Sequence, residues 1–432
     1  METSPPDARL AGHPPGVAIL AITEVWERFS YYGMRALLVF YMIKHLQFSQ
    51  AHASSIYGAY TAAVWMTPLF GGIIADRLIG QHRAVLFGGS LMAAGHFMMA
   101  FESLFFPALA AIAIGNGLFK PNVSTQVGDL YAADDPRKDR GYSLFYVGIN
   151  FGAFLAPLGC GTVGELFGWH WGFGLAGVGM LAALGTYIYG RRWLPPDRRY
   201  RRLDQAAPAR TSSVNDARRI ATLTVISLGA ALFWMIFEQQ GNTIALWADT
   251  YTDRVIRLGG HAMTIPASWF QSLNGLFIVT LTPIVLAIWR HQSSRRREPE
   301  TIVKMGIGAA IGGLAYVLMA VAAMHEGTSG PVSWLWLCAY FSVLTFGELY
   351  LSPTCLSLFN ELSPSGLAST MLGVWYMSLF LGSYLAGFAG TFWGQTPKPV
   401  YFAVMAACGF LSSAALFAVR RSLPLPVRAR GP

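Results

Sequence analysis

Long apolar stretches alternate with short polar connections along almost the whole chain. A membrane-spanning helix needs about 20 mostly apolar residues, and many of these stretches reach that length. Because lipid offers no hydrogen-bond partner to the backbone, such runs predict helices rather than strands. The predicted spans are residues 16–43, 53–75, 84–103, 105–127, 141–163, 169–190, 219–243, 268–290, 302–323, 332–354, 368–391 and 398–419.

Composition supports lipid as the solvent of this chain. Hydrophobic residues make up 54% of its 432 residues and charged residues only 12%, whereas soluble domains carry about 25% charged residues. The chain is therefore predicted to be an all-α membrane protein with about twelve transmembrane helices. Its net charge of +9 does not indicate a nucleic-acid partner, because the basic residues lie in short connections between apolar stretches.

The sequence shows no sign of a metal centre or of an enzyme active site. All four cysteines lie in apolar stretches and are expected to be small core residues: Cys160, Cys338, Cys355 and Cys408. Their spacing fits neither a metal site nor a disulfide framework. A nucleophile paired with a base and a phosphate-binding glycine loop are not visible either. We therefore expect no cofactor, no metal and no enzymatic activity.

Basic residues gather in every second connection, which sets the expected orientation. Since Lys and Arg favour the cytoplasmic side, both termini are predicted to be cytoplasmic, in the plasma membrane (the inner membrane of a bacterium). The longest polar connection divides the spans into six and six. The predicted parts are an N-terminal tail (1–15), an N-terminal six-helix bundle (16–190), a cytoplasmic linker (191–218), a C-terminal six-helix bundle (219–420) and a C-terminal tail (421–432).

The connection after the second span carries a further motif. It places Gly72, Asp76-Arg77, Gly80 and Arg83 in that order. The motif resembles the signature of major facilitator transporters, in which two six-helix halves move about a midplane site. The glycines are expected to allow close helix approach. An ordinary cytoplasmic turn with orienting charges is the alternative interpretation.

Ionisable residues inside the predicted spans point to a functional site. A charge at membrane depth costs about 2.5–3.5 kcal/mol on insertion scales, so such residues need partners or water. They are Glu24, Glu27, Arg28, Arg35, Lys120, Glu238 and Glu348. Their signs nearly balance, which makes extensive mutual pairing possible.

The first span carries the densest polar pattern. Glu24, Glu27, Arg28, Tyr31, Tyr32 and Arg35 fall within an arc of roughly 140° at about 100° per residue. One face of this helix is therefore polar, and it is expected to face a protein interior or a wet cavity. A purely structural salt-bridge network is the alternative.

Several motifs together resemble one transporter family. Glu24-Val-Trp-Glu27-Arg28-Phe-Ser-Tyr31-Tyr32-Gly33 closely resembles the first-helix signature of the proton-coupled oligopeptide transporter (POT) family of the major facilitator superfamily. Similar motifs follow in the family's order at 115–122, 145–153, 233–239, 268–274, 348–353 and 373–378. This resemblance implies a proton-coupled symporter that takes up di- and tripeptides by alternating access.

The resemblance also implies roles for individual residues. Those implied in proton coupling and gating are Glu24, Glu27, Arg28, Lys120 and Glu238, with a gating pair between Glu238 and Arg35. Those implied at the substrate carboxylate are Arg35 and Lys120. Those implied at the substrate amino group are Glu348, Asn150 and Asn274. Those implied in pocket lining are Tyr31, Tyr32, Tyr60, Trp234, Trp375 and Ser378, although core packing explains Tyr60 equally well.

The substrate class has one alternative. A relative with the same fold and proton coupling could have drifted to nitrate, another anion or a peptide-like drug. A carrier of simple anions has no need of the acidic Glu348, which favours a zwitterion such as a short peptide. The expected partners are therefore short peptides, protons and the lipid bilayer, and the protein is expected to be a monomer.

Overall fold

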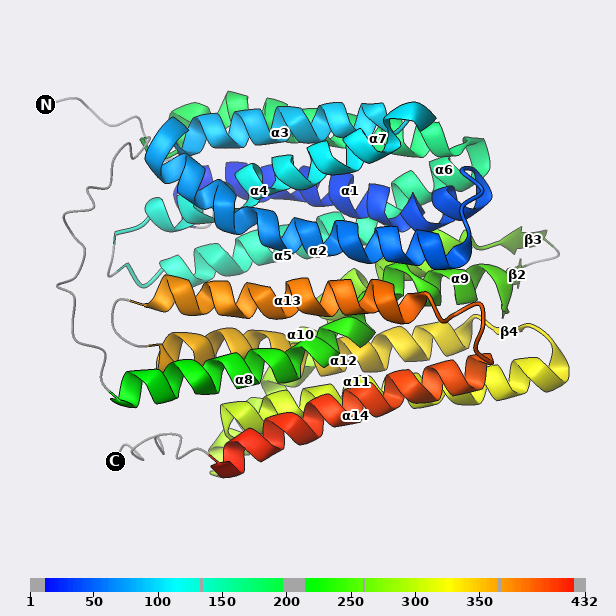
Figure 1. Ribbon diagram of the computed structural model, residues 1–432. Helices are drawn as coiled ribbons and strands as arrows, with labels where there is room; N and C mark the ends of the chain where they lie inside the picture. Colours follow the sequence, from blue (N-terminus) through cyan, green and yellow to red (C-terminus); the bar gives the residue numbers. More distant parts are fainter. Residues whose placement is uncertain (1–11, 133–134, 197–213, 259–260, 364–366, 423–432) are drawn as a thin grey trace, which may run out of the picture. The chain divides into compact units, whose positions relative to one another are not determined.

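The computed structural model describes residues 12–132, 135–196, 214–258, 261–363 and 367–422, which are mostly helical (Figure 1). The chain forms two compact units. Unit 1 comprises Met1–Leu38 and Met66–Leu203, and unit 2 comprises Val39–Trp65 and Asp204–Pro432. The end of the first helix and the beginning of the second are thus grouped with the second half of the sequence.

Unit 1 is built from long helices that pack around a common core. Its elements are most of α1 (Pro15–Lys44), the end of α2 (Gln50–Ile74), the π-turn η1 (Ala75–Ile79), α3 (Gln81–Met98), η2 (Glu102–Leu104), α4 (Phe105–Asp129), α5 (Lys138–Ala156), the π-turn η3 (Pro157–Gly161), α6 (Thr162–Phe167), α7 (Trp169–Gly190) and η4 (Arg191–Trp193). Helices α3, α4 and α7 meet around Met92, Phe119 and Met180, which are fully buried.

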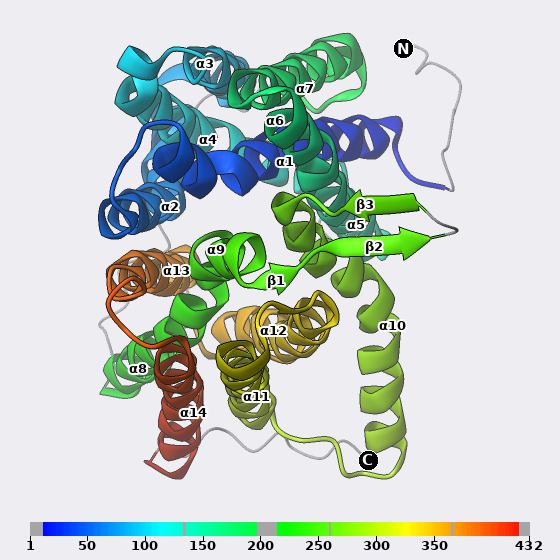
Figure 2. The same cartoon turned by 90° about the vertical axis from the view of Figure 1, so that its right-hand side faces the viewer.

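Unit 2 contains the remaining long helices and all the described strands. Its elements after the linker are α8 (Val214–Phe237), η6 (Glu238–Gly241), α9 (Thr243–Thr250), β1 (Thr252–Asp253), β2 (Val255–Leu258), β3 (His261–Thr264), η7 (Ala267–Gln271), α10 (Ser272–Ser294), α11 (Thr301–Ser329), β4 (Val332–Ser333), α12 (Leu335–Leu362), α13 (Ala368–Gly390) and α14 (Lys398–Ser422). Figure 2 shows α10 at the edge of this unit, where its main helical neighbour is α12.

Each predicted span lies mostly on helix, so the prediction of about twelve transmembrane helices is confirmed. The exceptions within the spans include residues 99–101, between α3 and η2, and β4 at the start of the span 332–354. Among the described residues, ten helices are long and apolar enough to cross a membrane by length and composition alone. Helix α1 is not among them, since Glu24, Glu27, Arg28 and Arg35 interrupt its apolar stretch. The fifth predicted span contains the π-turn η3, which begins at Pro157. The larger part of the predicted linker, residues 197–213, lies outside the described residues.

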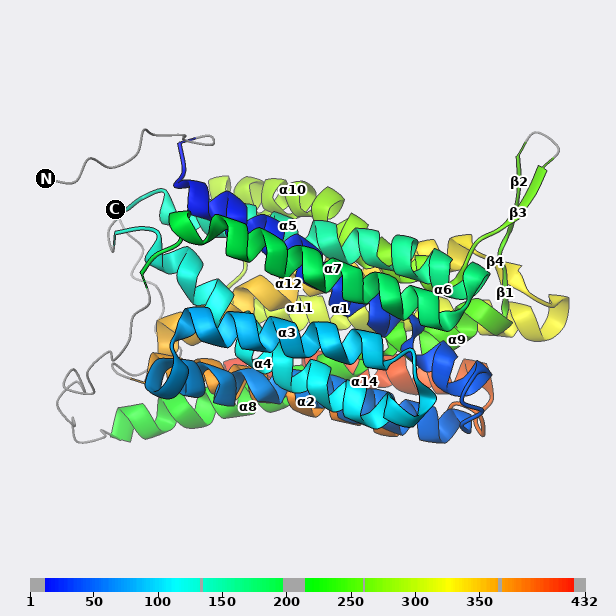
Figure 3. The same cartoon turned by 90° about the horizontal axis from the view of Figure 1, so that it is seen from above.

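The short strands were not predicted. Strand β1 pairs in parallel with β4, and β2 pairs with β3 as an antiparallel hairpin that stands away from the helices of unit 2 (Figure 3). These strands have two to four residues. That is too short for an alternating pattern to stand out in the sequence.

The turn after α2 explains part of the Gly72–Arg83 motif. Gly80 has a φ of +84°, a conformation that side chains disfavour, and its N–H donates to the Ala75 carbonyl at 2.8 Å. The expectation that Gly72 serves close helix approach is wrong, because a Cβ there would meet nothing within 4 Å. Its neighbour Gly71 has that role, since a Cβ there would lie 1.9 Å from the Gly117 carbonyl oxygen on α4.

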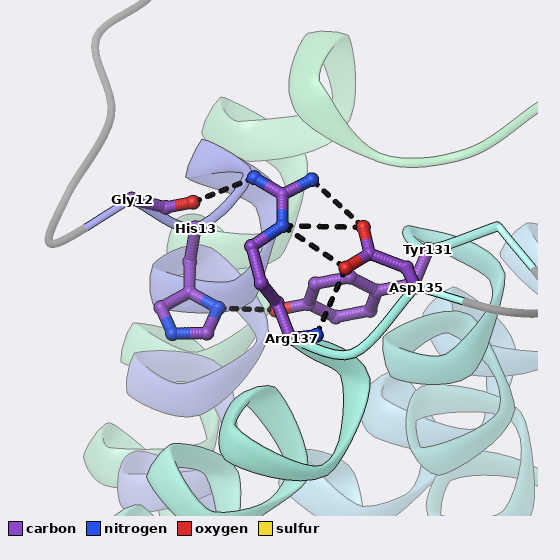
Figure 4. Close-up of polar contacts among 5 residues, drawn as sticks. All are labelled: Gly12, His13, Tyr131, Asp135 and Arg137. Carbon is purple, nitrogen blue, oxygen red and sulfur yellow. Dashed lines mark hydrogen bonds and ion pairs between the residues drawn. The ribbon is translucent and has the colours of Figure 1, made fainter.

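The segment before α1 is attached to the connection between α4 and α5 (Figure 4). The Arg137 Nη1 donates to the Gly12 carbonyl at 2.8 Å, and the His13 Nδ1 lies 2.7 Å from the Tyr131 hydroxyl. Arg137 is itself held by Asp135, with Nη2 and Oδ2 2.7 Å apart. The hydrogen bonds from Arg137 lower the pKa of Asp135 to about 2. This carboxylate therefore stays ionised at any physiological pH.

Candidate functional site

The charged residues of α1 form a buried cluster in unit 1. Glu24, Glu27 and Arg28 are 1%, 0% and 3% exposed. The Arg28 guanidinium donates through Nη2 to Glu27 Oε1 at 2.6 Å and through Nε to the other oxygen of the same carboxylate. Its Nε also lies 3.2 Å from Glu24 Oε1. One guanidinium thus serves two carboxylates, and this fork-like geometry is typical of strong arginine–carboxylate pairs.

Helix α4 completes this cluster from the opposite side. Asn116 is fully buried and its Nδ2 donates to Glu27 Oε1 at 3.3 Å. Lys120, one helical turn further along, interacts electrostatically with Glu24 and Glu27. Sequence reasoning missed Asn116. Its signal was its position four residues before Lys120, which places both side chains on one face of the helix.

The aromatic residues of α1 extend the cluster along the helix. The Arg28 guanidinium carbon lies 5.2 Å from the Tyr31 ring centre and 5.9 Å from that of Tyr32. The Arg35 guanidinium carbon lies 5.7 Å from the Tyr32 ring centre. These distances are typical of cation–π contacts. The structure thus brings the predicted polar stripe of α1 together as one continuous set of contacts.

A second polar cluster lies in unit 2, between α10 and α12. The Asn274 Nδ2 donates to Glu348 Oε2 at 2.9 Å and to the Thr345 hydroxyl at 3.1 Å. Glu348 is partly buried. Among the described residues Glu348 takes part in no ion pair, and the side chain that binds its carboxylate is the amide of Asn274. Sequence reasoning missed Thr345, although it lies three residues before Glu348 on the same helix.

Aromatic side chains form a third group, also within unit 2. The ring centres of Trp234 on α8 and Trp375 on α13 are 5.8 Å apart at an interplanar angle of 69°. Ser378 is 2% exposed, and its hydroxyl donates to the Trp375 carbonyl at 2.6 Å. Tyr60 on α2 is buried in the same unit. The lining role of these residues stays a prediction.

Glu238 occupies a break between two helices. It starts the short 3₁₀ segment η6, where α8 ends and α9 has not yet begun, and is 2% exposed. The next residue, Gln239, donates to the Ala386 carbonyl on α13 at 2.9 Å and accepts from Thr243 at 2.9 Å. The predicted partner of Glu238, Arg35, belongs to unit 1. That pair therefore stays a prediction.

Asn150 lies in unit 1, on α5, whereas Glu348 and Asn274 lie in unit 2. It is 5% exposed, and its Nδ2 donates to the Tyr146 carbonyl of its own helix at 2.9 Å. The predicted amino-group residues therefore do not come from one unit, and the role of Asn150 stays a prediction.

Comparison with known proteins gives consistent matches. The POT family matches residues 82–202 and 199–404. A di-/tripeptide transporter of Lactococcus lactis subsp. cremoris is 36% identical, covering 85% of this chain and 87% of its own. A crystal structure of a peptide transporter POT in complex with sulfate is 30% identical with a TM-score of 0.87, covering 96% of both chains. A POT family transporter in complex with a thioalcohol-conjugated peptide is 25% identical with a TM-score of 0.87, covering 96% of this chain and 98% of its own.

Proposed function

Since this chain belongs to the POT family, we propose that it takes up di- and tripeptides together with protons by alternating access. The observation that carries the proposal is the different charge of two polar clusters. The α1–α4 cluster together with Arg35, all in unit 1, holds three cations (Arg28, Arg35 and Lys120) and two carboxylates (Glu24 and Glu27). In unit 2 the carboxylate of Glu348 is bound by the amide of Asn274. A short peptide is a zwitterion and needs a partner of each kind.

In this proposal the two ends of the peptide are recognised by different chemistry. Arg35 and Lys120 bind the carboxylate, because a guanidinium offers paired donors in the plane that a carboxylate requires. Glu348 binds the ammonium group, with Asn150 and Asn274 as supporting polar groups. Because Asn274 already donates to one Glu348 oxygen, the carboxylate is oriented before a substrate arrives. Tyr31, Tyr32, Tyr60, Trp234, Trp375 and Ser378 line the side-chain pockets.

Proton coupling is assigned to the α1–α4 cluster. The proton affinity of a buried carboxylate depends on how close its cationic partner lies. Glu24 and Glu27 share the single guanidinium of Arg28. A rearrangement that moves Arg28 or Lys120 away from these two carboxylates therefore favours proton uptake by a carboxylate. Return of the cation favours release of that proton. Glu238 takes part through the gating pair with Arg35.

We further propose that both termini face the cytoplasm of a bacterial cell and that the protein works as a monomer in the inner membrane.

We also propose that a set of contacts closes the outer side in this structure, and we call this set the outer latch. It comprises the pairs Lys44–Asp249, Gln50–Gly390, Ser54–Asn242 and Gly58–Gly387, all within unit 2. These pairs join α1 and α2 to α9 and α13. Opening toward the outside requires their separation.

The outer latch is tightest where α2 crosses α13. A Cβ added to Gly387 would lie 2.6 Å from the Gly58 Cα, so Gly387→Val is expected to push α2 and α13 apart. Overpacking costs about 1–3 kcal/mol, so the closed state should lose about 5- to 150-fold in relative population. Labelling of a cysteine at Ser54, which is fully buried, from the outer side should speed up accordingly in a background without the native cysteines.

The matched control for this variant is Gly174→Val on α7, because a Cβ at Gly174 meets nothing within 4 Å. It should leave labelling of the Ser54 position unchanged. The smaller Gly387→Ala covers the case in which the valine prevents folding. Unchanged labelling in both folded Gly387 variants would contradict the latch.

The transport activity itself is tested by uptake of labelled dialanine into proteoliposomes. Uptake should rise with an inward proton gradient and should be competed by unlabelled di- and tripeptides, but not by free alanine. Gradient-independent uptake would contradict proton coupling. A lack of uptake by correctly folded and inserted protein would favour the alternative of a drifted substrate.

A further inference from the structure

The cytoplasmic end of α10 carries four exposed arginines: Arg290, Arg295, Arg296 and Arg297. We call them the arginine cap. Within the described part of the chain, none of the four takes part in an ion pair, although the same connection contains two acidic residues.

Both acidic residues of this connection are bound to other cations. The Glu298 Oε1 lies 2.5 Å from the Lys304 Nζ, and the Glu300 Oε2 lies 2.8 Å from the Arg420 Nε on α14. Lys304 also stacks on Trp289, with Nζ 4.1 Å from the ring centre. The local acids therefore hold neighbouring helices together and leave the arginine cap available for an external anion.

The cap continues a row of exposed apolar side chains on α10. Leu276, Val279 and Leu286 are 37%, 48% and 49% exposed. They precede Arg290 by 14, 11 and 4 residues, which at about 100° per residue places all of them within about 40° of Arg290 around the helix. A single stripe thus leads from exposed apolar side chains to an exposed guanidinium.

Arg296 occupies a backbone position that favours glycine. It has a φ of +54°, and the turn closes with Arg296 N–H donating to the Ser293 carbonyl and Arg297 N–H donating to the Gln292 carbonyl, both at 2.9 Å. This is the Schellman ending of a helix, in which the left-handed residue is usually glycine. An arginine here is less suited to the turn than glycine, so it adds a charge to the cap without adding stability to the helix end.

We propose that the arginine cap binds the phosphate of an anionic phospholipid whose acyl chain lies along the apolar face of α10. Guanidinium groups bind phosphate through paired hydrogen bonds, and clusters of basic residues just outside a span are attracted to anionic headgroups. The position of α10 at the edge of unit 2 (Figure 2) suits a lipid ligand. This inference does not depend on which substrate the protein carries.

The test measures lipid binding to the full-length protein in neutral detergent by native mass spectrometry. Wild type should bind phosphatidylglycerol more tightly than the zwitterionic phosphatidylcholine. The variant with all four cap arginines changed to glutamine should lose this preference, with phosphatidylglycerol bound at least about tenfold more weakly, because each basic residue near a membrane contributes about a fivefold factor. A cap variant that keeps the preference overturns the proposal.

Two further variants separate a local site from total charge and from stability. Replacing Arg83, Lys138, Arg140 and Arg191 by glutamine removes the same number of charges elsewhere and should leave the preference intact; an equal loss overturns the proposal.

The variant Arg296→Gly separates the charge from stability. It should melt at the same temperature as wild type or higher, yet bind phosphatidylglycerol about fivefold more weakly. Unchanged lipid binding by this variant overturns the role of Arg296. Inorganic phosphate at constant ionic strength should not displace the lipid, and displacement would indicate a site for free anions instead.

Discussion

Glu27→Gln is expected to reduce accumulation of dialanine in a proton gradient to the level of protein-free vesicles, while exchange of labelled for unlabelled peptide continues. Glu27 is fully buried, and its carboxylate is bound by Arg28 and Asn116. A glutamine keeps the size and one oxygen acceptor but carries no proton on and off. Exchange needs no net proton movement, so it should survive. Both are measured in the same proteoliposomes.

The matched control for this experiment is Asp135→Asn, which neutralises a carboxylate outside the membrane. Arg137 holds the pKa of Asp135 at about 2, below its ordinary value of 3.8. Any contribution of this pair to the stability of the folded state is therefore fully present above pH 3.8 and is lost as the pH falls through about 2. This variant should therefore leave the pH dependence of uptake unchanged. If the Glu27→Gln variant accumulated dialanine to the wild-type level, Glu27 would have no role in proton coupling.

Glu348→Gln is expected to weaken binding of peptides with a free amino terminus by at least about 30-fold, since removing one partner of a buried charge pair costs about 2–5 kcal/mol. Peptides with an acetylated amino terminus have no ammonium group and should be affected far less. The measurement compares competition by dialanine and acetyl-dialanine in wild type and variant. An equal loss for both peptides would rule out the ammonium role.

Thr345→Val serves as the control for Glu348→Gln. It removes the second hydrogen-bond acceptor of Asn274 and keeps the Glu348 charge. A single hydrogen bond contributes about 0.5–1.5 kcal/mol, so a loss of at most about tenfold is expected, without discrimination between free and acetylated peptides. A selective loss for free peptides in Thr345→Val would show that orientation of Asn274 matters as much as the charge.

The helices were predictable because the energetic requirement behind them is local. Each segment in lipid must satisfy its own backbone, and the apolar run that does so is visible in the sequence. The charged residues of the site were equally visible, because a charge such as Glu27 inside an apolar run is rare and costly. Uncharged polar residues stand out less, which is why Asn116 and Thr345 were missed.

Other features depended on tertiary packing and could not be predicted. Adjacent helical residues do not face each other, yet the long Arg28 side chain reaches back to Glu27 as well as to Glu24. The role of Gly71 rather than Gly72 depends on where α4 crosses α2. The grouping of residues 39–65 with the second half of the chain depends on which helix ends approach each other.

Helix α1 crosses the boundary between the two units without a break. It runs continuously from Pro15 to Lys44, although the boundary falls between Leu38 and Val39. No Pro lies between Glu27 and Lys44, and the glycine within this length, Gly33, stays in the helix, where an added Cβ would lie 2.4 Å from the Cys160 sulfur. From Glu27 to Lys44 the helix is about 25 Å long at about 1.5 Å per residue. In the proposed mechanism, helix α1 therefore acts as a rigid rod that carries the carboxylate cluster near its middle and one pair of the outer latch at its end, and a tilt of the helix is expected to displace both.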